Sequence, residues 1–363
     1  MHDIDELKQF GAAHARAQQI TPTRYREICA RITSDDEASP GSWTGEWGRA
    51  AETLRKQGRH LEACGYYNLA RFPYVDGPAR MRALRDCVAE CTRWSAARKD
   101  IERLEVDADG GRVSCWATGL SRTEPKPLLL IMGGIVSIKE QWAPLLTQLG
   151  KLGLAGVVTE MPGVGENTTA YTAESWQLIS AIMDAVSDRA DVSSTYAMAL
   201  SFSGHMALRC SVRDRRIKGI VTVAAPVSDF FAEAGTQNKL PGITVSTLAH
   251  LTRLEPSAVS DHMRDWGLTA DELSAVGIPV YYVASRRDEI IPEGDLRFLR
   301  DHVSRLHVLE YDEEHAAPRY AAETRAWVML SILRMSGSGL LQRAALTSVW
   351  GVLRARRRLT ELV

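Results

Sequence analysis

Short apolar runs that alternate with helical stretches from residue 128 onward constrain the fold more than any other feature of the chain. The runs occupy residues 128–132, 155–159, 195–200, 217–224, 279–284 and 306–311. Most of these runs are largely apolar instead of alternating, with Lys218, His307 and Glu310 as the charged or ionisable exceptions, which is typical of strands with helices packed on both faces. Helical segments are expected between the runs, for example over 139–151 and 174–187. The pattern predicts an α/β fold with a mostly parallel, doubly wound sheet.

The region before these runs differs in character. Residues 1–100 have helical periodicity and no clear strand. The β-rich runs 101–107 and 112–117 then flank a turn that contains Gly110 and Gly111, which predicts a β-hairpin. We therefore divide the chain into an N-terminal helical lobe, an α/β core with a helical lid insertion, and a C-terminal tail. Their expected bounds are 1–100, 101–335 with the lid at 229–276, and 336–363.

The composition excludes several classes of protein. The chain has 44 Lys and Arg residues against 45 Asp and Glu residues, so it lacks the basic field that nucleic-acid binding requires. The most apolar stretch, 128–138, is about half the length of a membrane-spanning helix. The first residues have neither the basic nor the apolar region of a secretory signal. We therefore expect a cytoplasmic protein with no nucleic-acid partner and no membrane span.

Metal and cofactor sites are not expected. The six cysteines do not have the spacing of a zinc site. Cys87 and Cys91 lie one helical turn apart, which suits either a metal or redox pair or small buried residues on one helix face, and we favour the second interpretation. The sequence has neither a dinucleotide fingerprint nor a phosphate loop. We expect no metal and no cofactor.

A serine directly after the run 195–200 has the setting of a nucleophile. In open α/β sheets, reactive groups follow the C-terminal ends of the strands. The segment Ala199-Leu-Ser-Phe-Ser-Gly204 leads from a strand straight into a helix, like a nucleophile elbow, with Ala199 and Ser203 where glycine usually stands. Ser201 is therefore the predicted nucleophile. The alternative is a serine that caps the helix.

A serine nucleophile needs a base and an orienting acid, which in this architecture come later in the chain. Asp288 follows the run 279–284 and is the predicted acid, with Glu289 as a weaker candidate and Asp229 as a second alternative. His315 follows the last run and is the predicted base. Its acidic neighbours, residues 312–314, should raise its pKa by favouring the charged imidazolium.

Backbone donors for an oxyanion are expected at two places. The N–H of Phe202, the residue after the nucleophile, should supply one donor. The loop Gly133-Gly-Ile-Val-Ser137 follows the run 128–132 and should supply the other, from Gly134 or Ile135, because glycine lets the backbone approach a substrate closely.

The chain resembles the α/β-hydrolase superfamily over roughly residues 40–335. The resemblance rests on Gly133-Gly-Ile-Val-Ser-Ile-Lys-Glu140, on Pro162-Gly-Val-Gly-Glu166 and on the helix pair around residues 58–67. These segments are similar to the branch with an N-terminal helical lobe, which includes 2,6-dihydroxypseudooxynicotine hydrolase and fungal pigment hydrolases that shorten polyketide chains. The resemblance implies a triad of Ser201, Asp288 and His315, a lobe that covers the active site, and cleavage of an ester or of a carbon–carbon bond next to a ketone.

We therefore expect a serine hydrolase that forms an acyl-enzyme on a small acyl or ketone substrate. The substrate would be an ester, a thioester or a β-keto compound, such as a polyketide-like or aromatic secondary metabolite. An acyltransferase or cyclase could use the same acyl-enzyme, and a binding protein could use the same fold without catalysis. Cleavage of a β-diketone also needs an acid for the leaving carbon, and Asp229 and Glu233 are candidates.

The substrate pocket is expected between the lobe and the lid. Aromatic residues of the lobe could line it and favour a flat aromatic or polyene substrate, although residues at helical spacing also suit a core. These residues are Trp43, Trp47, Tyr66 and Tyr67.

The tail, residues 336–363, predicts a basic amphipathic helix. An apolar segment at 340–350 is followed by Arg354, Arg356, Arg357 and Arg358. Such a helix can lie on a membrane or on an acidic partner. The alternative, which we favour, is a terminal helix that packs on its own domain or across a homodimer contact.

Overall fold

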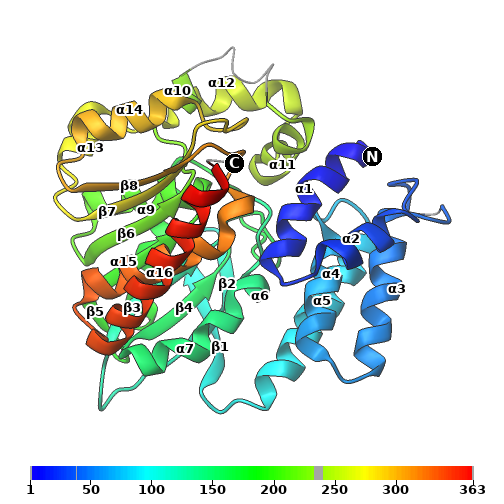
Figure 1. Cartoon of the computed structure of the whole chain (residues 1–363), viewed down its shortest axis with the longest axis horizontal. Helices are drawn as coiled ribbons and strands as arrows, with labels where there is room; N and C mark the ends of the chain where they lie inside the picture. Colours follow the sequence, from blue (N-terminus) through cyan, green and yellow to red (C-terminus); the bar gives the residue numbers. More distant parts are fainter. Residues whose placement is uncertain (1, 38, 233–239, 362–363) are drawn as a thin grey trace.

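The computed structural model describes residues 2–37, 39–232 and 240–361, and an eight-stranded sheet lies at its centre (Figure 1). The strand order is β1-β2-β4-β3-β5-β6-β7-β8, with β2 antiparallel to both of its neighbours and all other neighbours parallel. The strands are β1 (Ile101–Ala108), β2 (Gly111–Thr118), β3 (Pro127–Met132), β4 (Ala155–Thr159), β5 (Asp191–Ala199), β6 (Ile217–Val223), β7 (Val280–Ser285) and β8 (Leu306–Tyr311). The predicted α/β fold is confirmed.

Helices cover both faces of the sheet, which explains the continuous apolar runs (Figure 1). Every residue of β4 is buried, and so is every residue of β3 after the first. The helices that follow the core strands are α8 (Gln177–Ala185), α9 (Phe202–Arg213), α14 (Glu293–His302) and α15 (Ala321–Ser336). Both α9 and α15 pack against β5 and β6.

The segment after β3 is more broken than the predicted helix over 139–151. It consists of α6 (Lys139–Trp142), a 3₁₀ turn at Ala143–Leu145, α7 (Leu146–Leu149) and a 3₁₀ turn at Gly150–Leu152. Pro144 lies in the first of these turns and has no N–H to continue an α-helical ladder. The expectation of one continuous helix was therefore wrong.

The N-terminal lobe is a group of helices beside the sheet (Figure 1). It contains α1 (Ile4–Ala17), α2 (Pro22–Cys29), α3 (Trp43–Lys56), α4 (His60–Arg71) and α5 (Pro78–Ala96). Trp43 and Trp47 are fully buried in its core, and Trp43 Nε1 donates to the Leu69 carbonyl at 2.7 Å. The lobe is thus built around its own aromatic core.

The helices between β6 and β7 meet the lobe at α1. They are α10 (Asp229–Ala232), α11 (Gly242–Thr252), α12 (Val259–Met263) and α13 (Ala270–Ser274). The Glu6 carboxylate of α1 accepts the N–H groups of Gly242 and Ile243 at 2.7 and 2.9 Å, which satisfies donors at the start of α11. The predicted lid and the lobe are therefore in direct contact.

A buried ion cluster lies next to the loop that follows β3. Lys139 Nζ lies 3.1 Å from Glu140 Oε1, 3.1 Å from Glu160 Oε1 and 2.7 Å from Glu166 Oε2. Burial disfavours the charged lysine, but the three carboxylates outweigh burial and raise its pKa. Glu160 also accepts the backbone N–H groups of Lys139 and Glu166. The cluster thus ties the loop after β3 to the turn after β4.

The C-terminal helix α16 (Leu340–Glu361) packs along α15. Arg357 of α16 is paired with Glu323 at 3.1 Å and lies over the Tyr311 ring. The outer side of α16 exposes several apolar side chains, namely Leu340, Leu341, Val349 and Val352. In the described part of the chain, no helix combines the length and the apolar character needed to cross a membrane.

Candidate active site

Ser201 occupies a strained turn between β5 and α9. Its backbone has φ +57° and ψ −129°, a conformation that residues other than glycine rarely adopt. The Ser201 N–H donates to the Val223 carbonyl at 2.8 Å, which holds the turn against β6. The Ser201 side chain makes no hydrogen bond to the start of α9, so the helix-capping interpretation is wrong.

The residues around Ser201 account for the unusual elbow sequence. A Cβ at Gly204 would lie 2.1 Å from Thr222 Oγ1, so strand and helix approach too closely for a side chain there. Ser203, which replaces a glycine, donates to the carbonyls of Met132 and Leu200 at 3.0 Å each. Its hydroxyl is therefore satisfied within the turn, and the substitution is compatible with the elbow geometry.

Ser201, His315 and Asp288 form a chain of hydrogen bonds. Ser201 Oγ lies 3.4 Å from His315 Nε2, and His315 Nδ1 lies 2.9 and 3.1 Å from the two carboxylate oxygens of Asp288. The three residues follow β5, β8 and β7, whose C-terminal ends lie at one edge of the sheet. Asp288 also accepts the N–H groups of Ile290 and Ile291, which fix its orientation.

The environment of His315 favours its charged form. Burial lowers the pKa of His315, but the charge and hydrogen bond of Asp288, together with the charge of Glu289, outweigh burial and raise it above 6.5. Glu289 also accepts the backbone N–H of His315 at 2.9 Å, so it holds the loop rather than the ring. We expected the neighbours of His315 at 312–314 to raise its pKa, whereas the charges that do so come from Asp288 and Glu289.

The backbone beside Ser201 offers donors for an oxyanion. A Cβ at Gly134 would lie 3.1 Å from Ser201 Cβ, so the loop after β3 touches the serine. The Ser137 N–H donates to the Gly134 carbonyl at 3.0 Å and closes a turn. Within the described ranges, no protein group accepts a hydrogen bond from the N–H of Ile135 or Phe202. These donors are available to a bound molecule.

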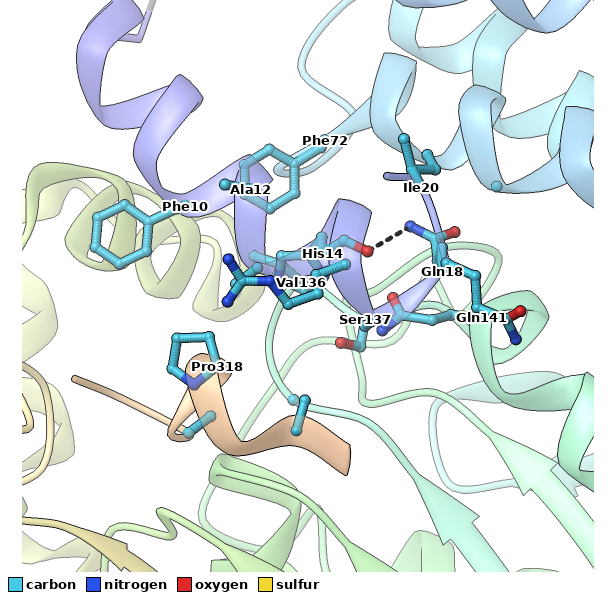
Figure 2. A pocket seen from close by; sticks show the side chains of 18 of the residues that line it. Phe10, Ala12, His14, Gln18, Ile20, Phe72, Val136, Ser137, Gln141 and Pro318 are labelled. Atoms are coloured by element: carbon cyan, nitrogen blue, oxygen red, sulfur yellow. Dashed lines mark hydrogen bonds between the residues drawn. The ribbon is translucent and has the colours of Figure 1, made fainter. Parts of the chain in front are cut away.

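These groups border a cavity of about 1250 Å³. Figure 2 shows part of its lining. The lobe, the helix α11, the start of α15 and the loop after β3 line it. Most of its wall is apolar, with residues such as Phe10, Ile20, Phe72, Ile243 and Met329. Ser201, His315, Gly134, Ile135 and Phe202 all border it. The cavity therefore joins the serine, the imidazole and the free backbone donors in one space.

Comparison with known proteins identifies the family. The family model described as "Esterase FrsA-like" matches residues 19–296. The chain belongs to the FrsA-like esterase family. It is accordingly an α/β-hydrolase enzyme, and the matched segment includes both Ser201 and Asp288.

Solved structures and curated relatives agree with this assignment. The structure titled "AbyA5 Wildtype" is 48% identical, covers 97% of this chain and 100% of its own, and superposes with a TM-score of 0.93. The crystal structure of the 2,6-dihydroxy-pseudo-oxynicotine hydrolase is 16% identical, covers 94% of this chain and 96% of its own, and has a TM-score of 0.67, which supports the shared fold. The Esterase FrsA of Vibrio vulnificus (strain YJ016) is 21% identical over 317 residues, 77% of this chain and 76% of its own length.

Some predicted site residues of this FrsA-like esterase lie outside the cavity. Trp47 and Tyr67 face the interior of the lobe, where Tyr67 Oη donates to Glu52 at 3.0 Å, and neither borders the cavity. Trp43 is likewise a core residue, whereas Tyr66 does border the cavity. The prediction of Trp47 and Tyr67 as substrate-binding residues was therefore wrong, and the alternative of a core role holds for three of the four aromatics.

Asp229 does not reach the imidazole. It begins α10, where its Oδ2 would lie 1.6 Å from a Cβ at Gly294, and it does not border the cavity. Asp295 accepts the N–H groups of residues 227–230 and holds this segment in place. The structure therefore offers no support for Asp229 as the orienting acid or as a second acid. Glu233 lies outside the described residues.

In the described ranges, one group of possible metal ligands is found, and it does not border the cavity. His2, Asp35 and Asp76 place ligand atoms within 4.8 Å of one another, but Arg80 already pairs with Asp35 at 2.5 Å and Asp76 at 2.9 Å. None of these residues borders the cavity. Cys87 and Cys91 are buried on α5, where burial raises the pKa of the Cys87 thiol and disfavours the thiolate that a metal would need.

Arg71 is a site residue that the sequence patterns did not reveal. Its guanidinium is almost fully buried in α4 and donates to Asn68 Oδ1 at 2.8 Å, to the Pro73 carbonyl at 2.9 Å and to the Val136 carbonyl. Burial lowers its pKa to about 10, which still leaves it charged at neutral pH. Val136 lies in the turn that carries the free N–H of Ile135. Arg71 therefore holds the loop after β3 from the side of the lobe.

We predict that Arg71→Met lowers kcat on any ester by about 10- to 100-fold with little change in KM, because a small displacement of the oxyanion donors weakens transition-state binding. Arg80→Met is the matched control. Arg80 is equally buried in the lobe and binds the Phe72 carbonyl, but it does not touch the loop. Both variants should melt at lower temperature, and only Arg71→Met should lose kcat below its melting point. Equal losses of kcat would contradict the role of Arg71.

The raised pKa of His315 leads to a prediction about how activity depends on pH. Only a neutral imidazole can accept the serine proton, so kcat/KM should fall as the pH falls, with a midpoint above 6.5. Glu289→Gln removes one of the charges that favour the imidazolium, so this variant should move the midpoint to lower pH. Measuring kcat/KM for a neutral ester between pH 5 and 9 checks both statements, and a wild-type midpoint below 6.5 would contradict them.

Proposed function

We propose that this FrsA-like esterase is a serine hydrolase in which Ser201 is the nucleophile, His315 the general base and Asp288 the orienting acid. The observation that carries the proposal is the hydrogen-bonded chain of these three side chains at the wall of a large cavity that also contains free backbone donors. This is the arrangement that acyl transfer to serine requires.

The proposed reaction begins when His315 Nε2 takes the proton of Ser201 as Oγ attacks a carbonyl carbon. Asp288 accepts a hydrogen bond from His315 Nδ1 and so keeps Nε2 free to act as the base. The N–H groups of Phe202 and of Gly134 or Ile135 stabilise the negative oxygen of the tetrahedral intermediate. The imidazolium then gives its proton to the leaving group, and a water molecule hydrolyses the acyl-enzyme by the same steps.

The proposed substrate is a bulky small molecule with an ester, thioester or β-keto group. A cavity of about 1250 Å³ with a mainly apolar wall exceeds what a short acyl ester needs and suits a polyketide-like or aromatic chain. The fold is shared with the 2,6-dihydroxy-pseudo-oxynicotine hydrolase, and the compound in that enzyme's name supports an aromatic substrate. In a β-keto cleavage, the His315 imidazolium would protonate the leaving carbon, since Asp229 lies elsewhere.

The proposal is tested by trapping and by turnover. A fluorophosphonate probe should label Ser201, and mass spectrometry of the digested protein should place the adduct on the peptide that contains it. A panel of aryl esters, acyl thioesters and β-diketones should then reveal at least one substrate. Labelling of a different residue, or turnover that survives without Ser201, would overturn the proposal.

A further inference from the structure

The outer side of α16 has the opposite polarity to that of an ordinary surface helix. Leu340, Leu341, Val349 and Val352 are four of the five large apolar side chains that are exposed in the described part of the chain. Figure 1 shows α16 on the outside of the molecule, in front of α15. The solvent-facing side of a surface helix usually carries charged and polar residues. A concentration of exposed apolar side chains is instead typical of a surface that another molecule covers.

The arginines of α16 lie mainly on its inner side. Arg354 lies over the Trp350 ring at 5.2 Å, and Arg357 pairs with Glu323 of α15 at 3.1 Å. The opposite side consists of exposed residues three and four positions apart, which share one side of a helix. We call them the outer stripe: Leu341, Ala344, Ala345, Ser348, Val352 and Ala355. None of them is charged, and the first charged residue on this side of the helix is Arg356.

The composition of the outer stripe favours a second helix over a membrane. A helix that lies on a membrane surface presents large apolar and aromatic side chains to the lipid. The stripe contains no aromatic residue, and four of its six members are alanine or serine. Small side chains let the axes of two helices approach closely. Within the stripe, the residues 341, 345, 348, 352 and 355 alternate in steps of four and three, which is the spacing of the contact line between two paired helices.

The order of residues along the outer stripe fits a second copy of this chain that runs antiparallel. About a two-fold axis at Ser348, Leu341 lies seven residues before the axis and Ala355 seven residues after it, while Ala344 and Val352 lie four residues to either side. Each large side chain would therefore face a small one of the other copy. A parallel pair would instead bring the two Arg356 side chains together. In the antiparallel pair they are about 24 Å apart along the helix axis, which is beyond the distance over which salt screens charges.

We propose that the outer stripe of α16 is the contact through which two copies of this chain form an antiparallel, two-fold symmetric dimer. The pairing covers exposed apolar side chains and buries no charge. The helix has 22 residues and is therefore about 33 Å long. A single pair of helices of this length is a small interface, so the dimer should dissociate on dilution. No described residue of α16 borders the cavity, so both cavities stay accessible and the inference does not depend on the proposed function.

Sedimentation equilibrium of the full chain tests the dimer. The mass of the wild-type protein should rise with concentration from that of one chain toward that of two. Ser348→Glu places two carboxylates against each other at the axis and should weaken the dimer by about tenfold or more. Thr347→Glu is the matched control, because both hydroxyls donate to the carbonyl four residues earlier, but Thr347 lies about 100° away around the helix. It should dimerise like wild type, and both variants should keep the wild-type circular dichroism spectrum.

Cysteine cross-linking tests the direction of the two helices. All six native cysteines are buried, so one added on the outer stripe is the exposed thiol. Ser348→Cys should give a disulfide-linked dimer with oxidised glutathione. Leu341→Cys should not, because the two copies of this position lie about 21 Å apart along an antiparallel pair.

Four outcomes would overturn the inference. The first is a wild-type mass that stays at one chain up to about 100 µM, which excludes a Kd below that concentration. The second is an equal effect of Ser348→Glu and Thr347→Glu on the mass. The third is cross-linking of Leu341→Cys as efficient as that of Ser348→Cys. The fourth is a monomer that binds phosphatidylglycerol vesicles and loses this binding in Ser348→Glu, which would show that a membrane covers the stripe.

Discussion

Ser201→Ala is expected to lower ester turnover by about 10⁶-fold, the loss found when subtilisin loses its serine. The reason is that the hydroxyl oxygen of Ser201 forms the covalent bond to the acyl group. Without it, the remaining turnover comes only from substrate binding and from the oxyanion donors. The fold should be unchanged, because the Ser201 side chain makes no capping hydrogen bond and an alanine can adopt the same strained backbone. Turnover of an activated ester, measured with circular dichroism on the same sample, checks the prediction.

The matched control for this prediction is Ser211→Ala. Ser211 lies on the same helix, is buried, and donates to the Leu208 carbonyl at 2.8 Å. Removing its hydroxyl should cost about 1 kcal/mol of stability and leave turnover at the wild-type level. If Ser201→Ala keeps more than a few per cent of wild-type turnover, the nucleophile is a different residue.

Asp288→Asn is expected to slow turnover by about 10⁴-fold, as the analogous change does in the trypsin-like serine proteases. The asparagine amide would donate to His315 Nδ1 and would place the ring proton on Nε2, where the base must be free. The effect should be specific, because Asp288 is held by two backbone N–H groups and the substitution changes little volume. Kinetics on one activated ester should also show a midpoint of kcat/KM at lower pH than in wild type.

Asp229→Asn provides the comparison for Asp288→Asn. Both residues follow neighbouring strands at the same end of the sheet, but Asp229 packs against Gly294 and makes no contact with His315. This variant should therefore turn over an activated ester within a few-fold of the wild-type rate. A larger loss for Asp229→Asn than for Asp288→Asn would show that the acid has been assigned to the wrong strand.

The central part of this architecture is predictable from the sequence because it depends on local patterns. Apolar runs indicate the strands, and the C-terminal ends of parallel strands meet at one edge of the sheet. Ser201, Asp288 and His315 each follow such a strand, so their proximity follows from the order of the runs along the chain. The loop with Gly134 lies beside the serine for the same reason. The positions of residues that directly follow strands are thus predictable whenever the order of strands in the sheet is predictable.

The part that could not be predicted depends on how the lobe docks. His14 borders the cavity and Arg71 contacts the loop after β3 because of the way α1 and α4 pack on the core. Helical periodicity identifies the apolar side of a helix but does not tell which neighbour that side will contact. The aromatic residues illustrate the same limit, since Trp47 and Tyr66 have similar spacing but only Tyr66 borders the cavity. The break in the predicted helix over 139–151 is indicated by Pro144, because proline interrupts an α-helix. The prediction used only the apolar periodicity of the segment and so missed it.

The cavity wall and the reacting groups come from different parts of the chain. Since α1, α4 and α11 carry much of the wall, substitutions on these helices can alter which acyl chain is accepted while the chemistry is conserved, so substrate range can drift during evolution. Arg71 limits this freedom, because it belongs to the lobe and yet holds Val136 of the core. A different lobe acquired by recombination would preserve activity only if it also supplied a hydrogen-bond donor to the Val136 carbonyl.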